Sequence, residues 1–135
     1  MKLWKMVLRY MDNVKTDKYY FEKAINDIDA VEKYFDHKTY EEFMADSMLI
    51  DAIMFRLVQL IENIKKISPD FKASHSSIEW GNIMGFRNGI VHEYGETDYT
   101  IVYEVVSKDL LELKELFEQC LWSNYLNQLP TAMAS

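Results

Sequence analysis

SMLIDAIMFRLVQLIENIKKI, residues 47–67, is the stretch on which the predicted fold rests. Apolar side chains recur in it every three or four positions, which is the spacing of one face of an α-helix. That face comprises Leu49, Ile50, Ile53, Met54, Leu57, Leu60, Ile61 and Ile64. We therefore expect a central helix that buries these side chains against its neighbours.

The segments on either side of this helix carry further helix signals. Residues 18–35 repeat the same apolar spacing and predict a second long helix. Thr39 is followed three residues later by Glu42, the pattern of a capping box, which predicts a short helix from residue 40. Proline and several serines in residues 68–77 predict a loop, in which His75 is expected to be exposed.

The second half of the chain is also helical in pattern. Residues 80–95 are compatible with one helix, and another is expected to begin at residues 99–106. Ser107 is expected to break or kink it, because serine favours helix caps over helix interiors. The apolar pattern then continues through residues 110–122, with Cys120 expected in the core.

No segment alternates as a β-strand does, so the predicted fold is all-α, an antiparallel bundle of four to six helices. Residues 17–122 are expected to form this bundle. Residues 1–16 mix apolar and basic side chains and predict an amphipathic extension, whereas residues 123–135 show no period and predict a tail.

Composition narrows the class of protein. The chain has 135 residues, 49% of them hydrophobic, which suffices for one domain with a core. Its single cysteine excludes an internal disulfide. No apolar run is long enough to span a bilayer, so we expect a cytoplasmic protein without membrane contact. The net charge of −7 argues against unspecific nucleic-acid binding, so any such site must be local.

All four glycines lie in WGNIMGFRNGIVHEYG, residues 80–95. On a helix, Arg87 would share the apolar side with Trp80 and Ile83, where an unpaired guanidinium is costly. It therefore needs a cleft or a carboxylate partner, for which Glu62 is our hypothesis. The other side carries small residues and an imidazole, and a second protomer or a nucleic-acid backbone could approach it closely. These residues are Gly81, Gly85, Asn88, Gly89 and His92.

The pairing of an arginine with a histidine suits phosphodiester chemistry without a metal ion or cofactor. Arg87 would hold the phosphate, and His92 would move protons near neutral pH. RNA supplies its own nucleophile, the 2′-hydroxyl. Five positions place the two residues about 140° apart on a helix. The length of Arg87, loosening near Gly89, or a site shared across a two-fold axis could bring them together, and we favour the shared site.

The motif RNGIVHEY, with Trp80 ahead of it and AIMFRLVQLIENIKKIS earlier in the chain, resembles the HepT-type toxins of the HEPN superfamily. The resemblance covers roughly residues 17–122. It departs from the family at Ile61-Glu62-Asn63, where Gly-Glu-Ala is usual, and at the first 16 residues.

The resemblance implies a helical homodimer that acts as a metal-independent endoribonuclease in a prokaryotic toxin–antitoxin pair. It implies that Arg87 and His92 are catalytic and that Asn88 helps to position them. Tyr94 corresponds to the tyrosine that a partner minimal nucleotidyltransferase antitoxin modifies with AMP. The bulk and charge of that group would exclude RNA from the cleft.

Two other interpretations remain open at the level of sequence. The chain could be a non-catalytic helical module that binds a nucleotide or a nucleotidyltransferase subunit through the same groove. It could also be a purely structural dimerisation bundle, in which case Arg87 is a buried ion-pair residue and replacement of His92 changes nothing but stability.

Overall fold

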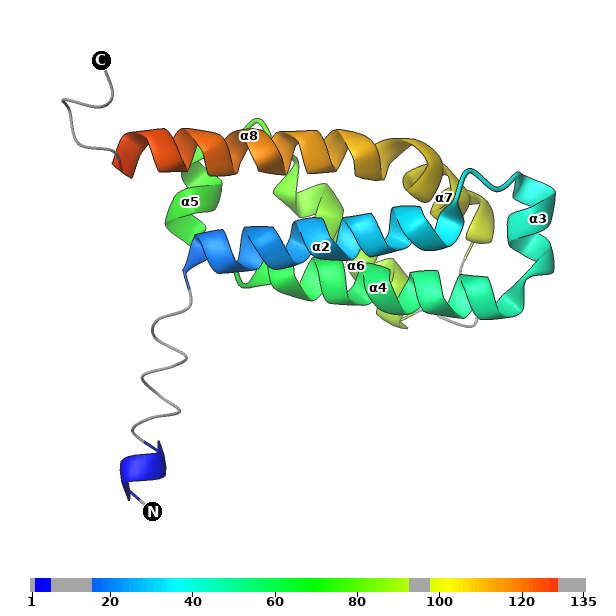
Figure 1. Ribbon diagram of the computed structural model, residues 1–135, viewed down its shortest axis with the longest axis horizontal. Coiled ribbons are helices and arrows are strands. Elements are labelled where there is room, and N and C mark those ends of the chain that lie inside the picture. The colour runs from blue at the N-terminus through cyan, green and yellow to red at the C-terminus, as the bar shows by residue number, and fades with distance from the viewer. Residues whose placement is uncertain (1, 6–15, 93–97, 129–135) are drawn as a thin grey trace.

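The computed structural model of the chain describes residues 2–5, 16–92 and 98–128. Regular structure within these residues is entirely helical, which confirms the predicted all-α fold. The three longest helices are α2 (Asp17–Phe35), α4 (Ser47–Lys65) and α8 (Leu110–Gln128). Helix α2 lies between the other two and runs antiparallel to both (Figure 1).

The core fills the space between these long helices. Helix α4 contributes the face predicted from its sequence, and Ile53, Leu57 and Ile64 are almost completely buried. Phe21 of α2 packs edge-on against Phe117 of α8, with 5.1 Å between ring centroids. Such aromatic pairs add to the stabilisation from buried apolar area. The core is therefore common to all three helices.

Four shorter helices complete the bundle. Helices α3 (Tyr40–Ala45) and α7 (Tyr99–Glu104) lie at one end, and α5 (Pro69–Ser74) lies at the other (Figure 1). Helix α6 (Trp80–His92) packs against α4. The described residues thus contain seven α-helices, α2 to α8, slightly more than the four to six predicted.

The predicted capping box at the start of α3 is confirmed. The Thr39 hydroxyl accepts a hydrogen bond from the Glu42 backbone N–H at 3.2 Å, and the Glu42 carboxylate accepts one from the Thr39 N–H at 3.1 Å. Both bonds satisfy donors that the helix itself leaves unpaired. They fix the entry into α3 after the turn at Asp36 and His37, which both adopt left-handed backbone angles.

The prediction of a plain loop over residues 68–77 was wrong, because α5 forms within it. The Ser68 hydroxyl caps this helix by accepting from the Phe71 N–H at 3.2 Å, and Pro69 occupies a first-turn position that needs no N–H donor. Ser68 also donates two hydrogen bonds to Asp17, at 2.7 and 2.8 Å. His75 is half-buried and stacks on the Phe71 ring at 4.2 Å.

Ser107 does not break the helix that begins at Tyr99. Residues 105–109 form a π-helical turn, η2 (Val105–Asp109), and the helix continues as α8. The Ser107 hydroxyl donates to the Tyr103 carbonyl at 2.7 Å, one turn earlier. A serine bonded back to the preceding turn is a known cause of such local distortions.

The structure describes the predicted N-terminal extension and the predicted C-terminal tail only in part. Residues 2–5 form a helical turn, while residues 1 and 6–15 of the predicted extension lie outside the described residues. Helix α8 continues to Gln128, so it enters the range predicted as a tail, and residues 129–135 again lie outside the description.

Candidate active site

Helix α6 is anchored at its start by Trp80. The indole N–H donates to the carbonyl oxygens of Lys72 at 3.2 Å and His75 at 3.1 Å, both at the end of α5. The Trp80 ring also stacks on Phe117 of α8, with centroids 6.2 Å apart. These contacts fix where α6 begins, and with it the direction in which the following residues extend.

The helix then continues without interruption to His92. The residues between Arg87 and His92 contain no π-turn, and none of the glycines of α6 has a positive φ angle. Loosening of the helix near Gly89 is therefore not what brings the two motif residues together. On a regular helix they lie about 7.5 Å apart along the axis and about 140° apart around it.

The structure describes only part of the predicted site. The backbone of Arg87 and His92 belongs to α6, but their side chains, like the whole of Tyr94, lie outside the described part of the chain. Asn88 is exposed on the glycine-bearing side of the helix. Glu62 is half-buried on α4, which packs against α6, and its pairing with Arg87 stays a prediction.

The glycine strip of α6 is open. A Cβ atom built at Gly81, Gly85 or Gly89 would meet no heavy atom of the described residues within 4 Å. Close packing against the described part of the chain therefore does not explain these glycines, each of which costs a helix roughly 0.5–1 kcal/mol relative to alanine. Gly95 lies outside the described residues.

Two lysine side chains, those of Lys66 and Lys72, lie over aromatic rings. The Lys66 ammonium lies 5.7 Å from the Tyr20 ring centroid, and that of Lys72 lies 5.9 Å from the Trp80 ring. Burial lowers the pKa of Lys72. Lys66 therefore covers a ring of α2 and Lys72 covers the ring at the start of α6, and both contacts are explained as cation–π pairs.

A polar cluster between α2 and α4 was not anticipated from the sequence. Asp27 is only 6% exposed, and its carboxylate accepts from Arg56 at 3.2 Å and from the Asn63 amide at 2.8 Å. Arg56 also donates to the Tyr34 hydroxyl at 3.5 Å. The hydrogen bonds that Arg56 donates to Tyr34 and Asp27 raise the pKa of the guanidinium. The available signal was the position of Asp27 on the apolar face of α2, beside Ala24 and Ile28.

This cluster is structural in character. It lies between two helices that pack against each other, with Asp27 buried and Arg56 partly exposed, and its opposite charges neutralise each other locally. No group of three or more histidine, cysteine, aspartate or glutamate side chains that could hold a metal ion occurs among the described residues. No helix of the described chain is long and apolar enough to cross a membrane.

Comparison with known proteins identifies the family. A family model described as "Ribonuclease HepT-like" matches residues 24–120, most of the bundle. The chain belongs to the HepT-like ribonuclease family. The matched range contains α6 and the motif from Arg87 to His92, together with the cluster around Asp27.

The match to this chain covers nearly the whole length of two curated relatives. "Putative RNase TTE0752" of Caldanaerobacter subterraneus subsp. tengcongensis is 27% identical over 108 residues, which are 80% of this chain and 96% of the relative. "Probable ribonuclease HepT" of Thermococcus cleftensis is 28% identical over 105 residues, 78% of this chain and 96% of that one. No solved structure matches this HepT-like chain.

Proposed function

We propose that this HepT-like protein is a metal-independent endoribonuclease and the toxin of a prokaryotic toxin–antitoxin pair. The observation that carries the proposal is the placement of Arg87, Asn88 and His92 on one uninterrupted helix in a chain of the HepT-like ribonuclease family. The family gives the class of reaction, and the three residues give it a chemical basis.

The proposed reaction uses the 2′-hydroxyl of RNA as the nucleophile. Its oxygen attacks the adjacent phosphorus and forms a 2′,3′-cyclic phosphate, while the bond to the 5′-oxygen breaks. His92 moves protons in this step, because an imidazole titrates near neutral pH. Arg87 binds the phosphate and offsets the charge that develops on its oxygens. Asn88 is a positioning residue that holds this pair or the RNA backbone by hydrogen bonds.

We infer that the site is shared between two copies in a homodimer. A regular helix directs Arg87 and His92 to different sides, so one α6 alone presents them poorly to a single phosphate. Two antiparallel copies of α6 could place Arg87 of one beside His92 of the other. The open glycine strip would allow the two backbones to approach closely.

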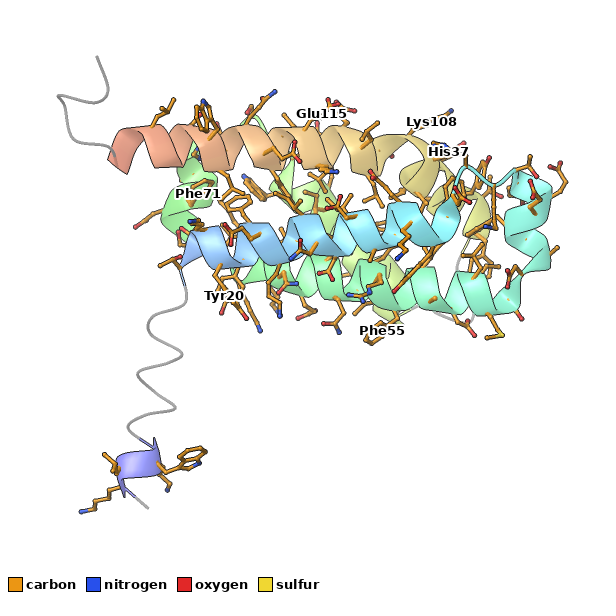
Figure 2. All side chains as sticks on the ribbon, in the orientation of Figure 1. Tyr20, His37, Phe55, Phe71, Lys108 and Glu115 are labelled. Carbon is orange, nitrogen blue, oxygen red and sulfur yellow. The ribbon has the colours of Figure 1, made fainter. Side chains whose placement is uncertain are left out.

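Apolar side chains on α4 support a self-complementary surface. Met48 is 82% exposed and Phe55 is 62% exposed, and Phe55 points away from the bundle (Figure 2). They lie seven residues apart and therefore on one side of α4, which packs against α6. We propose that both side chains lie in the contact between the two copies, where they would be removed from water.

Tyr94 supports the proposal of a nucleotidyltransferase antitoxin. It follows His92 by two residues, so an AMP group on its hydroxyl would place a phosphate and a nucleoside beside the proposed cleft. The phosphate would compete for Arg87, and the nucleoside would occupy the space that RNA needs. We therefore propose that the partner minimal nucleotidyltransferase silences the enzyme by modifying Tyr94.

The test is cleavage of RNA by the purified protein in excess EDTA. We expect products that end in a 2′,3′-cyclic phosphate and a 5′-hydroxyl, and no cleavage where a 2′-deoxynucleotide replaces the nucleotide at the cut. Arg87→Ala and His92→Ala should each lower the rate at least about 100-fold. Lys33→Ala removes an exposed cation from α2 and serves as the matched control.

Each result has a definite reading. Equal rates for the parent and both motif variants would contradict the ribonuclease and favour a non-catalytic module that binds a nucleotide or a nucleotidyltransferase. Cleavage that stops in EDTA would contradict the metal-independent mechanism. Expression of the same variants in cells would test the toxin role, because growth arrest should accompany RNA cleavage and disappear with it.

A further inference from the structure

An apolar cavity of about 580 Å³ lies between α4, α6 and the segment formed by η2 and α8. Its size is within the range of about 300–1,000 Å³ that is typical of binding pockets. Apolar side chains from all three sides form its walls, including Leu60 and Ile64 of α4, Ile83 and Phe86 of α6, and Leu113 and Leu116 of α8. The bundle therefore leaves a concave apolar surface along one side of α6.

The charged part of the lining is acidic, and its other polar residues, Ser77 and Asn82, are neutral. Glu79, Asp109 and Glu112 line the cavity, and all three are exposed. None of the described residues that line it is a lysine or an arginine. An occupant that combined large apolar groups with positive charge would match both parts of this surface.

The N-terminal segment of the same chain has this composition. Residues 2–5 form a helical turn in which Leu3 is 73% and Trp4 is 66% exposed, and lysines flank the pair at positions 2 and 5. This turn stands clear of the bundle, as Figure 1 shows. The sequence that follows adds Val7, Leu8 and Met11 together with Arg9. The segment lies outside the family match, which begins at residue 24.

The chain between the two surfaces is long enough to connect them. Residues 6–16 separate the turn from α2, and eleven residues span up to about 36–40 Å when extended. Helix α4 has 19 residues and is about 28 Å long. The segment can therefore reach any point along the bundle. A tether of this length also gives a local concentration that a separate partner would rarely match.

We propose that residues 2–11 dock into this cavity of their own chain, with Leu3 and Trp4 in the apolar part and Lys2 and Lys5 beside the acidic rim. The docked segment contacts Ile83 and Phe86 and so clamps α6 against α8. The Arg87 motif begins at the residue after Phe86. Docking does not depend on the ribonuclease proposal, whereas any effect on RNA cleavage rests on it.

Cysteine cross-linking of the full chain tests the docking. Lys5→Cys combined with Glu112→Cys places one thiol on the segment and one on the rim, and both native residues are exposed. The matched control combines Lys5→Cys with Lys33→Cys, which lies on the exposed side of α2 and does not line the cavity. Cys120 is retained because it is buried, and Lys5→Cys alone reports any reaction with it.

A short bis-maleimide should join residues 5 and 112 within one chain at least about fivefold more efficiently than residues 5 and 33. Adding Trp4→Ala to the first pair should remove most of this difference, because the indole is the largest apolar group of the segment. High salt should reduce the yield only in part, since salt screens the lysines but not the apolar contacts.

Two results would overturn the proposal. The first is equal cross-linking of the two pairs, which would show that the segment samples the surface without preference. The second is a product at residue 112 found only at twice the mass of the chain, which would place the segment on a second copy. Either result would leave the measurement of RNA cleavage unaffected, so the failure of this inference is distinguishable from the failure of the proposed function.

Discussion

Asp27 is a charged residue in a buried position. A carboxylate that is almost completely buried is tolerated only when its oxygens are paired, and Arg56 and Asn63 provide that pairing from the neighbouring helix. Such a cluster also defines one register between α2 and α4, because a shift of either helix would leave a buried charge unpaired. Removal of one partner is therefore expected to cost more stability than replacement of the whole cluster by apolar side chains.

Replacing Asp27 by alanine should lower the free energy of unfolding by about 1–3 kcal/mol, because it leaves the amide of Asn63 without this acceptor and leaves the partly exposed Arg56 with Tyr34 alone. Urea unfolding followed by circular dichroism measures the change. Asp29→Ala on the same helix is the control. Its ion pair with Lys114 is partly exposed and should be worth less than about 1 kcal/mol. Equal losses for the two variants would contradict a buried structural role for Asp27.

Among the described elements, α3 begins with a capping box in which both hydrogen bonds are formed. The backbone N–H of Thr39 donates to the Glu42 carboxylate and is the main cause of the lowered pKa of that group. The pKa of an unfolded glutamate is about 4.3. Because the folded value is lower, the interaction stabilises α3 fully above that pH and is lost as the pH falls through the folded pKa.

Titration of the Glu42 carboxyl carbon by NMR should therefore give a lower pKa in the native protein than in the same protein unfolded in urea. Thr39→Ala keeps the backbone donor and removes only the hydroxyl, so it should raise the native pKa part of the way to its ordinary value and destabilise the helix start by about 1 kcal/mol. A native pKa equal to the unfolded one would show that the carboxylate does not accept this bond in solution.

Helix α6 is the element in which helix propensity and proposed function conflict. Alanine at Gly85 would favour the helix by roughly 0.5–1 kcal/mol, and its methyl group would meet no other part of the described chain within 4 Å. If the strip contacts a second copy, the same methyl group would lie in that interface. We therefore expect Gly85→Ala to weaken self-association and RNA cleavage about tenfold while the helix content stays unchanged.

Analytical ultracentrifugation and the RNA assay measure the two effects of Gly85→Ala. Gly81→Ala lies one turn further from the motif and should have a smaller effect on cleavage. A Gly85→Ala protein that is more stable and fully active would show that the strip faces only solvent.

At the scale of the whole molecule, the question is whether one chain contains a complete site. Subunits that carry Arg87→Ala and His92→Ala are each expected to be inactive. In a mixed dimer with shared sites, one site combines both substitutions and the other combines both native residues. Random mixing in equal amounts should therefore restore about one quarter of the parent activity, since half the dimers are mixed and each has one intact site.

Measurement of RNA cleavage after the two inactive variants are unfolded and refolded together tests this complementation. Refolding each variant alone is the control. No recovered activity in verified mixed dimers would place Arg87 and His92 of a functional site in the same chain.

Several features of this protein were determined by local sequence. The buried face of α4, the capping box at Thr39 and the length of α2 all follow from interactions between residues close in the chain, so their periodicity and spacing suffice to predict them. The motif from Arg87 to His92 was visible for the same reason, and the resemblance to HepT-type toxins that it carried agrees with the family match.

Only the tertiary structure decided the rest, because contacts between distant residues leave no local pattern. In the sequence, Asp27 resembles an exposed helix carboxylate. Its partners Arg56 and Asn63 lie on α4 and approach it only in the folded bundle. Residues 68–77 looked like a loop because the contacts that hold α5, from Asp17 and Trp80, come from elsewhere in the chain. The cavity beside α6 depends on how closely α6 and α8 approach each other, which is a balance of packing that no single segment encodes.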